Sequence, residues 1–398
     1  MVQTGLDILL GEEIAGLRGR RVGVLCHPAS VDSRLVHIVD ALAAAQVNLT
    51  RLFGPEHGIR GEAQDMIGVA GNRDPRTGIP VTSLYGETAL SLAPTAVELA
   101  DIDVLLVDLQ DVGSRYYTFI WTMALCLQSA ARAGVAVVVL DRPNPIGGAS
   151  IEGGEVAPWA ESFVGLGSVP IRHGLTIGEV ARLVRVGMPW GGERFAKPLD
   201  CDLQVVAMRR WKRGDFFDAT GLPWVLPSPN MPTVDTALVY PGLCLLEGTN
   251  ISEGRGTTRP FEIVGAPFVD GYRLAESLAA DRLPGVRFRP LSFRPTFHKF
   301  AGQVCGGVQI HVLDRLAFRP YLTGVAILRA LRALVGEAFR WRTEKYEFVS
   351  DRPAIDLLTG GDAIRKGIEA GVSLDDLRAS WQSAEDAFAD RRRACLLY

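Results

Sequence analysis

The sequence lacks the short motifs that mark the commonest nucleotide, metal and serine-nucleophile sites. No G-x-G-x-x-G or G-x-x-x-x-G-K-[ST] segment occurs, so neither a dinucleotide fingerprint nor a phosphate-binding loop is present. There is also no H-E-x-x-H pair and no G-x-S-x-G elbow. These absences predict a protein that needs neither a nucleotide cofactor nor a metal ion.

Cysteine is sparse and an excess of basic charge is missing. The six cysteines include no C-x-x-C pair, which favours reduced thiols over a zinc knuckle or a disulfide framework. The 42 Lys and Arg residues are balanced by 45 Asp and Glu, so the chain has no excess positive charge that would attract nucleic acid. No apolar run reaches membrane-spanning length, and the N-terminus shows no signal-peptide pattern. We therefore expect a cytoplasmic protein that binds neither nucleic acid nor membranes.

What the chain does have is a strongly apolar, alternating first half. Runs typical of buried parallel strands occupy residues 21–26, 48–53, 103–109 and 135–141. Helical spacing is found at 33–45 and 117–134, and Gly134 fits the end of the second helix. Thr95 with Glu98 and Thr176 with Glu179 have the spacing of capping boxes. The pattern predicts an α/β fold with a Rossmann-like, doubly wound parallel sheet.

A chain of 398 residues is longer than one hydrophobic core usually supports, which favours two domains. The second half of the sequence also differs in its pattern of predicted strands and helices. Residues 286–297 and 306–314 resemble strands, 322–336 a helix, and another helix follows Ser373. The proline-rich stretch 222–233 suits a crossing between domains. We predict a Rossmann-like catalytic domain at 1–235 and a smaller α+β domain at 236–398 that closes a cleft.

Three polar loops follow predicted strands of the first domain, at 54–61, 110–117 and 141–148. Any one of their acids could merely cap a helix or close a turn. Because ligands bind at the carboxyl ends of strands in open α/β sheets, three such loops together favour a composite active site. The glycine-rich stretch 247–262 of the second domain would form the opposite wall of the cleft.

Carboxylates are the chemistry that these loops offer most abundantly. Glycoside cleavage normally uses two of them, one to protonate the leaving oxygen and one to activate water or attack. The sequence does not show which two come together. A hydrolase or transferase acting on another anionic sugar, and a non-catalytic carbohydrate-binding protein, remain open alternatives.

Several motifs, in this order along the chain, give the sequence a specific resemblance. They are "GPEHGIRG" (54–61), "RTGIPVTSLYG" (76–86), "DLQDVGSRYYTFIWTM" (108–123), "LDRPNPIGG" (140–148), "PIRHGLTIGE" (170–179), "LPWVLPSPNMPT" (222–233) and "YPGLCLLEGTNISEGRGTTRPFE" (240–262). Together they resemble the NamZ-type exo-β-N-acetylmuramidases. The resemblance implies removal of N-acetylmuramic acid from the non-reducing end of peptidoglycan fragments, without metal or nucleotide. The glutamate of the "PEHG" motif lands on Glu56, which is then the leading catalytic acid.

The candidate site residues come from these loops and from the resemblance. The catalytic candidates are Glu56, His57, Asp111, Glu152 and Glu253. The substrate-binding candidates are Arg60, Arg115, Tyr117, Asp141, Asn144, Asn230, Glu247, Asn250 and Arg255. Because N-acetylmuramic acid carries a lactyl carboxylate, an arginine should bind it, and Arg115 and Arg255 are the leading choices.

Overall fold

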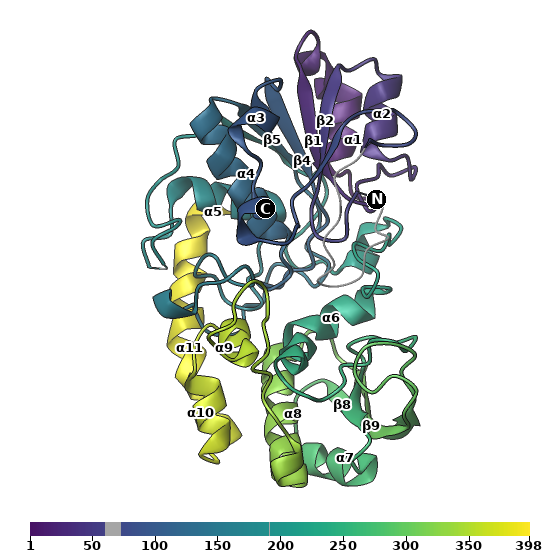
Figure 1. Ribbon diagram of the computed structural model, residues 1–398, viewed down its shortest axis with the longest axis vertical. Helices are drawn as coiled ribbons and strands as arrows, with labels where there is room; N and C mark the ends of the chain where they lie inside the picture. Colours follow the sequence, from purple (N-terminus) through teal and green to yellow (C-terminus); the bar gives the residue numbers. More distant parts are fainter. Residues whose placement is uncertain (60–72, 191) are drawn as a thin grey trace.

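A six-stranded parallel sheet organises the first part of the computed structural model, which describes residues 1–59, 73–190 and 192–398 (Figure 1). The strand order is β3-β2-β1-β4-β5-β6. The strands are β1 (Val22–Cys26), β2 (Leu49–Gly54), β3 (Val81–Ser83), β4 (Val104–Asp108), β5 (Ala136–Leu140) and β6 (Leu203–Val206). The four central strands lie where the sequence predicted them. The short edge strands β3 and β6 were not predicted, because they are partly exposed and lack a long apolar run.

Helices cover both faces of this sheet, as the alternation of its side chains requires. Leu105 and Val107 of β4 point into one apolar cluster, while Val104 and Leu106 point into another. The first cluster is completed by α3 (Ala96–Leu99), α4 (Phe119–Ala133) and α5 (Ile177–Val186). The second is completed by α1 (Gly5–Ile8) and α2 (Ile38–Ala44). The doubly wound α/β fold predicted from the sequence is confirmed.

The local helix signals were right in most places and wrong in one. The capping boxes at Thr95 and Thr176 both form, and Gly134 ends α4 with a φ of 68°. The helix predicted at 33–45, however, begins only at Ile38. The Asp32 carboxylate accepts hydrogen bonds from two backbone N–H groups within 33–36 and holds that segment in a turn.

The second domain is built on a three-stranded antiparallel sheet in the order β7-β9-β8. Its strands are β7 (Ile263–Ala266), β8 (Val286–Phe293) and β9 (Cys305–Val312). Its helices are α6 (Val234–Leu243), α7 (Gly271–Ala280), α8 (Pro320–Val335), α9 (Ala354–Thr359), α10 (Ala363–Glu369) and α11 (Leu374–Arg391). A Cβ on Gly242 would lie 1.9 Å from the Pro320 carbonyl oxygen, so glycine is what lets α6 and α8 touch.

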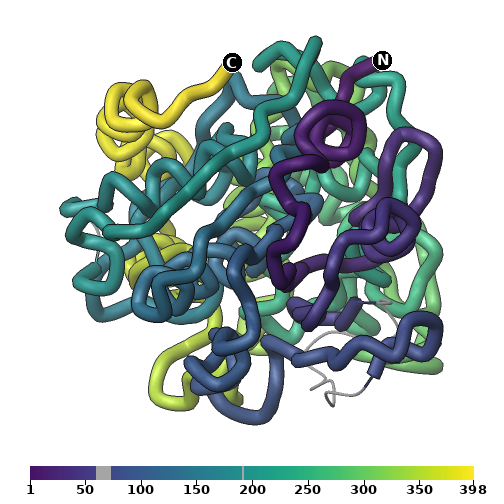
Figure 2. The backbone as a smooth tube through the Cα atoms, turned by 90° about the horizontal axis from the view of Figure 1, so that it is seen from above, coloured from purple at the N-terminus to yellow at the C-terminus, as the bar shows by residue number. Residues whose placement is uncertain are grey.

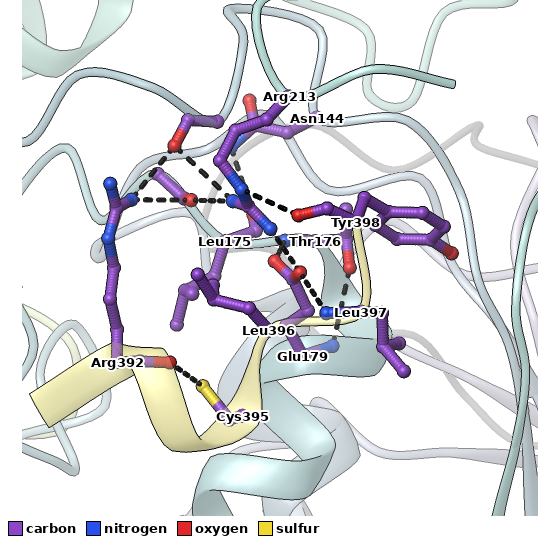
Figure 3. A network of polar contacts seen from close by, with 12 residues as sticks. Asn144, Leu175, Thr176, Glu179, Arg213, Arg392, Cys395, Leu396, Leu397 and Tyr398 are labelled. Atoms are coloured by element: carbon purple, nitrogen blue, oxygen red, sulfur yellow. Dashed lines mark hydrogen bonds and ion pairs between the residues drawn. The ribbon is translucent and has the colours of Figure 1, made fainter. Parts of the chain in front are cut away.

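The end of the chain returns to the first domain. Figure 1 shows α11 running from the second domain up to α5, and Figure 2 shows both termini on the same side of the molecule. Beyond α11, Arg392 donates to the carbonyl oxygens of Gly148 and Gly174, and Leu397 N donates to Glu179 (Figure 3). Tyr398 Oη donates to Asp141 Oδ2 at 2.6 Å and accepts from Met208 N. This C-terminal segment therefore fastens the second domain to the sheet of the first.

We expect Tyr398→Phe to lower the free energy of unfolding by about 1–3 kcal/mol, because it removes one of the two hydroxyl donors to the buried Asp141 Oδ2 and takes away the acceptor of the Met208 backbone N–H. Urea denaturation measures the loss. Tyr272→Phe is the matched control, since Tyr272 is 73% exposed and should tolerate the change. Equal denaturation midpoints for both variants would show that the C-terminal contact does not stabilise the fold.

Candidate active site

A cavity lies where the loops after β2 and β4 meet the second domain. Residues from both domains and from the connecting segment line it. They are Glu56, His57, Tyr116, Tyr117, Thr118, Phe119, Val164, Ser228, Asn230, Met231, Tyr240, Glu247, Arg255, Phe261, Tyr346 and Glu347. Of the predicted site residues, Glu56, His57, Tyr117, Asn230, Glu247 and Arg255 are thus brought together.

Glu56 is delivered to the cavity by a tight turn directly after β2. A Cβ on Gly54 would lie 3.0 Å from the backbone nitrogen of Ile59, so the chain folds back closely at this point. Glu56 is only 6% exposed, and its Oε2 accepts a hydrogen bond from Thr118 Oγ1 at 3.0 Å. Thr118 stands just before α4, so the segments that follow β2 and β4 together fix the carboxyl group.

Aromatic rings form much of the wall. Tyr240 meets Tyr117 and Phe261 edge to face, with ring centroids 5.7 and 4.8 Å apart. Tyr116 donates its hydroxyl hydrogen to the Pro241 carbonyl oxygen, which ties the β4 loop to α6. Rigid aromatic surfaces of this kind suit the apolar face of a sugar ring.

Arg255 brings a positive charge to the cavity and is held by two buried glutamates. Its Nη2 lies 2.6 Å from Glu247 Oε1, and its Nε lies 3.3 Å from Glu253 Oε1. The guanidinium carbon lies 5.1 Å from the centre of the Phe261 ring. Glu253 in turn accepts from Lys299 Nζ at 2.9 Å. The arginine is therefore fixed in place before any substrate arrives.

Glu253 was predicted to be catalytic, but its surroundings do not suit a proton donor. It is fully buried and does not line the cavity. Burial raises the pKa of its carboxyl, yet the cations Lys299 and Arg255 outweigh burial and hold that pKa at about 2. A group that stays ionised at neutral pH cannot protonate a leaving oxygen, so Glu253 is better described as positioning Arg255.

We expect Glu253→Gln to destabilise the protein by about 3–5 kcal/mol at neutral pH, because it removes one partner of a buried ion pair. The folded-state pKa of about 2 lies below the ordinary value of 4.5. The ionised carboxylate therefore stabilises the fold above the ordinary pKa, and this stabilisation is lost as the pH falls towards 2. Denaturation at neutral and acidic pH should show the difference from wild type shrinking in acid. A difference that does not change with pH would contradict this assignment.

The side chains of two predicted binding residues form hydrogen bonds with backbone groups and do not line the cavity. Arg115 is fully buried, and its guanidinium donates to the carbonyl oxygens of Gly154, Val169 and Leu358 at 2.7–3.0 Å. Asn250 donates to the Ala338 carbonyl oxygen and accepts from Arg340 N. Neither lies among the residues that line the cavity.

The polar side chains of the loop after β5 form hydrogen bonds within the protein. Asp141 accepts from Gly178 N at 2.8 Å and from Thr176 Oγ1 at 2.8 Å, in addition to Tyr398. Asn144 donates to the Leu175 carbonyl oxygen and accepts from Ile146 N. The polar loop at 141–148 therefore anchors α5 and the C-terminal segment and contributes nothing to the cavity lining.

Two further acids predicted as catalytic also lie outside the cavity lining. Asp111 accepts from Gly113 N at 2.7 Å and lies 3.4 Å from His173 Nε2. Glu152 pairs with Arg172 at 3.2 Å and accepts from Tyr321 N of α8, so it links the two domains. Arg60, also predicted to bind substrate, lies outside the described residues.

The cavity contains one carboxylate that the sequence did not single out, Glu347. It is 5% exposed and accepts a hydrogen bond from Tyr85 Oη at 3.2 Å. Its backbone is left-handed, with a φ of 45°, as are those of His57 at 72° and Phe261 at 62°. Such conformations cost non-glycine residues about 1–3 kcal/mol each and cluster at functional sites. These left-handed conformations could not be predicted from the sequence, because none of the three residues is a glycine.

In residues 1–59, 73–190 and 192–398, no group of three or more His, Cys, Asp and Glu side chains could hold a metal ion. Within the same ranges, no helix is both long enough and apolar enough to cross a membrane.

The sequence is similar to those of known proteins over its whole length. The family models of the exo-β-N-acetylmuramidase NamZ match residues 22–235 with the N-terminal part and 238–398 with the C-terminal part. The chain belongs to the NamZ family. A relative from Bacillus subtilis (strain 168), named peptidoglycan β-N-acetylmuramidase NamZ, is 46% identical over 100% of this chain and 91% of its own. The family predicted from the sequence motifs is confirmed.

Solved structures with the same fold come from Bacteroides fragilis NCTC 9343. One DUF1343 family protein superposes with a TM-score of 0.88 at 34% identity, covering 100% of this chain and 99% of its own. A second reaches a TM-score of 0.78 at 28% identity, with the same coverage of both chains. The overall fold is therefore shared with these two proteins.

Proposed function

We propose that this protein is an exo-β-N-acetylmuramidase that hydrolyses the terminal N-acetylmuramic acid from the non-reducing end of peptidoglycan fragments. Membership of the NamZ family supports the reaction class. The observation that carries the proposal is the position of Glu56, a buried carboxyl group in a cavity closed by two domains. A cavity, unlike an open groove, suits an enzyme that accepts the end of a chain.

In this proposal Glu56 is the general acid. In its protonated form it gives its proton to the glycosidic oxygen as the bond to the sugar C1 breaks. The hydrogen bond from Thr118 fixes the orientation of the carboxyl group, and the aromatic wall around Tyr117 and Tyr240 holds the sugar ring.

Arg255 is the group that we propose to bind the lactyl carboxylate of N-acetylmuramic acid. Arg255 lines the cavity, whereas the guanidinium of Arg115 lies outside the lining and donates hydrogen bonds to three backbone carbonyl oxygens. Its anchoring by Glu247 and Glu253 fixes the guanidinium, so little freedom is lost when a carboxylate binds.

Chromogenic β-glycosides test the proposed function. Purified protein should release the chromophore from the N-acetylmuramic acid glycoside and leave the N-acetylglucosamine glycoside nearly intact. Preference for a different anionic sugar would favour the alternative hydrolase or transferase. Binding of N-acetylmuramic acid without any turnover would favour a carbohydrate-binding protein.

We expect activity to survive exhaustive treatment with EDTA and to require no added nucleotide, because the proposed chemistry uses only carboxylates and water. The measurement is turnover of the chromogenic muramic acid glycoside before and after dialysis against the chelator. Loss of turnover that one divalent ion restores would contradict the proposal.

A further inference from the structure

A groove on the second domain, distinct from the cavity, has no part in the proposed function. Its lining combines the basic residues His298, Lys299, Arg340 and Arg342 with aromatic rings and short polar side chains. Among the described lining residues, one is acidic, Glu344. Because the chain as a whole has slightly more acidic than basic residues, the positive charge of this groove is a local feature.

Two of the four basic side chains are available to a ligand. Lys299 Nζ lies 2.9 Å from one carboxylate oxygen of the buried Glu253, and His298 Nδ1 lies 3.3 Å from the other. These two groups therefore face the protein interior. Arg340 and Arg342, in contrast, make no ion pair with a carboxylate of the described residues, and Arg340 is exposed. An anion in the groove would find two arginines on the same segment.

The segment that carries Arg340 is held in place by Asn250. The Asn250 backbone N–H donates to the Arg340 carbonyl oxygen at 3.0 Å, and Arg340 N donates to Asn250 Oδ1 at 2.9 Å. Asn250 Nδ2 also donates to the Ala338 carbonyl oxygen at 2.9 Å. The backbone of the groove is thus fixed before a ligand arrives, so less freedom is lost on binding.

Aromatic side chains give the groove an apolar surface beside these charges. Phe268 is 39% exposed, and its ring meets Phe300 edge to face with centroids 6.0 Å apart. Trp341 packs against Phe339 at 4.8 Å, and its Nε1 donates to Glu369 at 2.8 Å. Rings that are held by their neighbours and partly exposed suit the C–H face of a sugar ring.

The groove lies next to the wall of the cavity. Thr249 and Asn250 line the groove and follow Glu247 of the cavity by two and three residues, so their Cα atoms lie within about 11 Å of its Cα. The Arg342 guanidinium carbon lies 5.1 Å from the centre of the Tyr346 ring, which lines the cavity. A polymer bound in the groove is therefore held close to the cavity.

We propose, on the basis of the proposed function, that this groove is a second saccharide site and binds the anionic glycan strand of peptidoglycan. In a strand without peptides each N-acetylmuramic acid carries a lactyl carboxylate, so negative charge recurs along the polymer. Arg340 and Arg342 pair with such a carboxylate, and Phe268 and Trp341 pack against a neighbouring sugar. Binding here keeps the strand near the cavity and raises the local concentration of its ends.

Binding is tested with a strand that the proposed activity does not cleave. The probe is a peptide-free glycan strand with N-acetylglucosamine at its non-reducing end, and a chitin oligosaccharide of the same length is the uncharged probe. Isothermal titration calorimetry compares wild type with Arg340→Glu and with the charge-keeping Arg340→Lys. Arg273→Glu is the matched control, since Arg273 is an exposed arginine of α7 outside the groove lining.

We expect Arg340→Glu to raise the Kd of the strand roughly tenfold, whereas Arg340→Lys and Arg273→Glu stay within about threefold of wild type. Wild type should bind the strand roughly tenfold more tightly than the chitin oligosaccharide, and about 1 M salt should abolish this preference because it screens exposed charges. Every variant should turn over the chromogenic muramic acid glycoside at the wild-type rate, since that small substrate occupies only the cavity.

Three results would overturn the groove site: unchanged binding of the strand by Arg340→Glu, an equal loss of binding in Arg273→Glu, or equal affinity of wild type for the strand and the chitin oligosaccharide. Turnover of the chromogenic glycoside separates this proposal from the proposed function. A wild type that binds the strand through Arg340 but cleaves no glycoside would overturn the proposed function, whereas an active wild type whose strand binding is independent of Arg340 would overturn only the groove site.

Discussion

Replacement of Glu56 by Gln is expected to lower kcat on a disaccharide of N-acetylmuramic acid and N-acetylglucosamine by roughly 10²–10⁴-fold. The amide keeps the size of the side chain and can still accept the hydrogen bond from Thr118, but it has no proton to give. The loss should be much smaller with an aryl glycoside, because an acidic leaving group departs without protonation. Steady-state kinetics on both substrates measure the two effects.

Glu87→Gln is a suitable control for this experiment, since Glu87 is an exposed glutamate outside the cavity lining. It should behave as wild type on both substrates. An active Glu56→Gln, or one impaired equally on disaccharide and aryl glycoside, would contradict the role of Glu56 as the general acid.

The second large effect is expected at Arg255 and concerns the choice of substrate. Arg255→Met would remove the guanidinium that pairs with the buried carboxylates of Glu247 and Glu253, so its main effect would be on folding. Arg255→Lys keeps the charge but loses the forked geometry that matches a carboxylate. A charge-assisted hydrogen bond contributes about 1.5–3 kcal/mol. The preference for muramic acid over glucosamine glycosides should therefore fall roughly ten- to hundredfold, at ~1.4 kcal/mol per decade.

The comparison of kcat/KM for the two glycosides isolates this effect from changes in stability, because instability lowers both values together. Arg259→Lys is the matched control, as Arg259 lies in the same segment with a side chain that is 46% exposed. If Arg255→Lys leaves the preference unchanged, the lactyl carboxylate is recognised by another group.

The fold could be predicted from the sequence to a large extent because its determinants are local. The continuous apolar runs of β1, β4 and β5 follow directly from burial of the sheet on both faces. The edge strands β3 and β6 could not be predicted in the same way, since their pairing with β2 and β5 depends on partners distant in the chain.

The site was less predictable, because tertiary contacts decide which polar residues face the cavity. Arg115 follows a strand end and looks like a ligand-binding arginine, yet one of its acceptors is the carbonyl of Leu358, which is 243 residues away. Glu347 gave no sequence signal, since its position depends on a left-handed backbone that its residue type does not favour. Glu56 was a candidate because it lies in a polar loop after a predicted strand, and the resemblance to a known family made it the leading catalytic acid.

The most direct test of the account is the order of products from a peptidoglycan glycan chain that begins with N-acetylmuramic acid at its non-reducing end. We expect the purified protein to release free N-acetylmuramic acid as the first product and to leave a chain ending in N-acetylglucosamine, with no shorter internal fragments. Mass spectrometry of early time points identifies both products. Internal fragments at early times, or no release of N-acetylmuramic acid from such a chain, would contradict the proposed function.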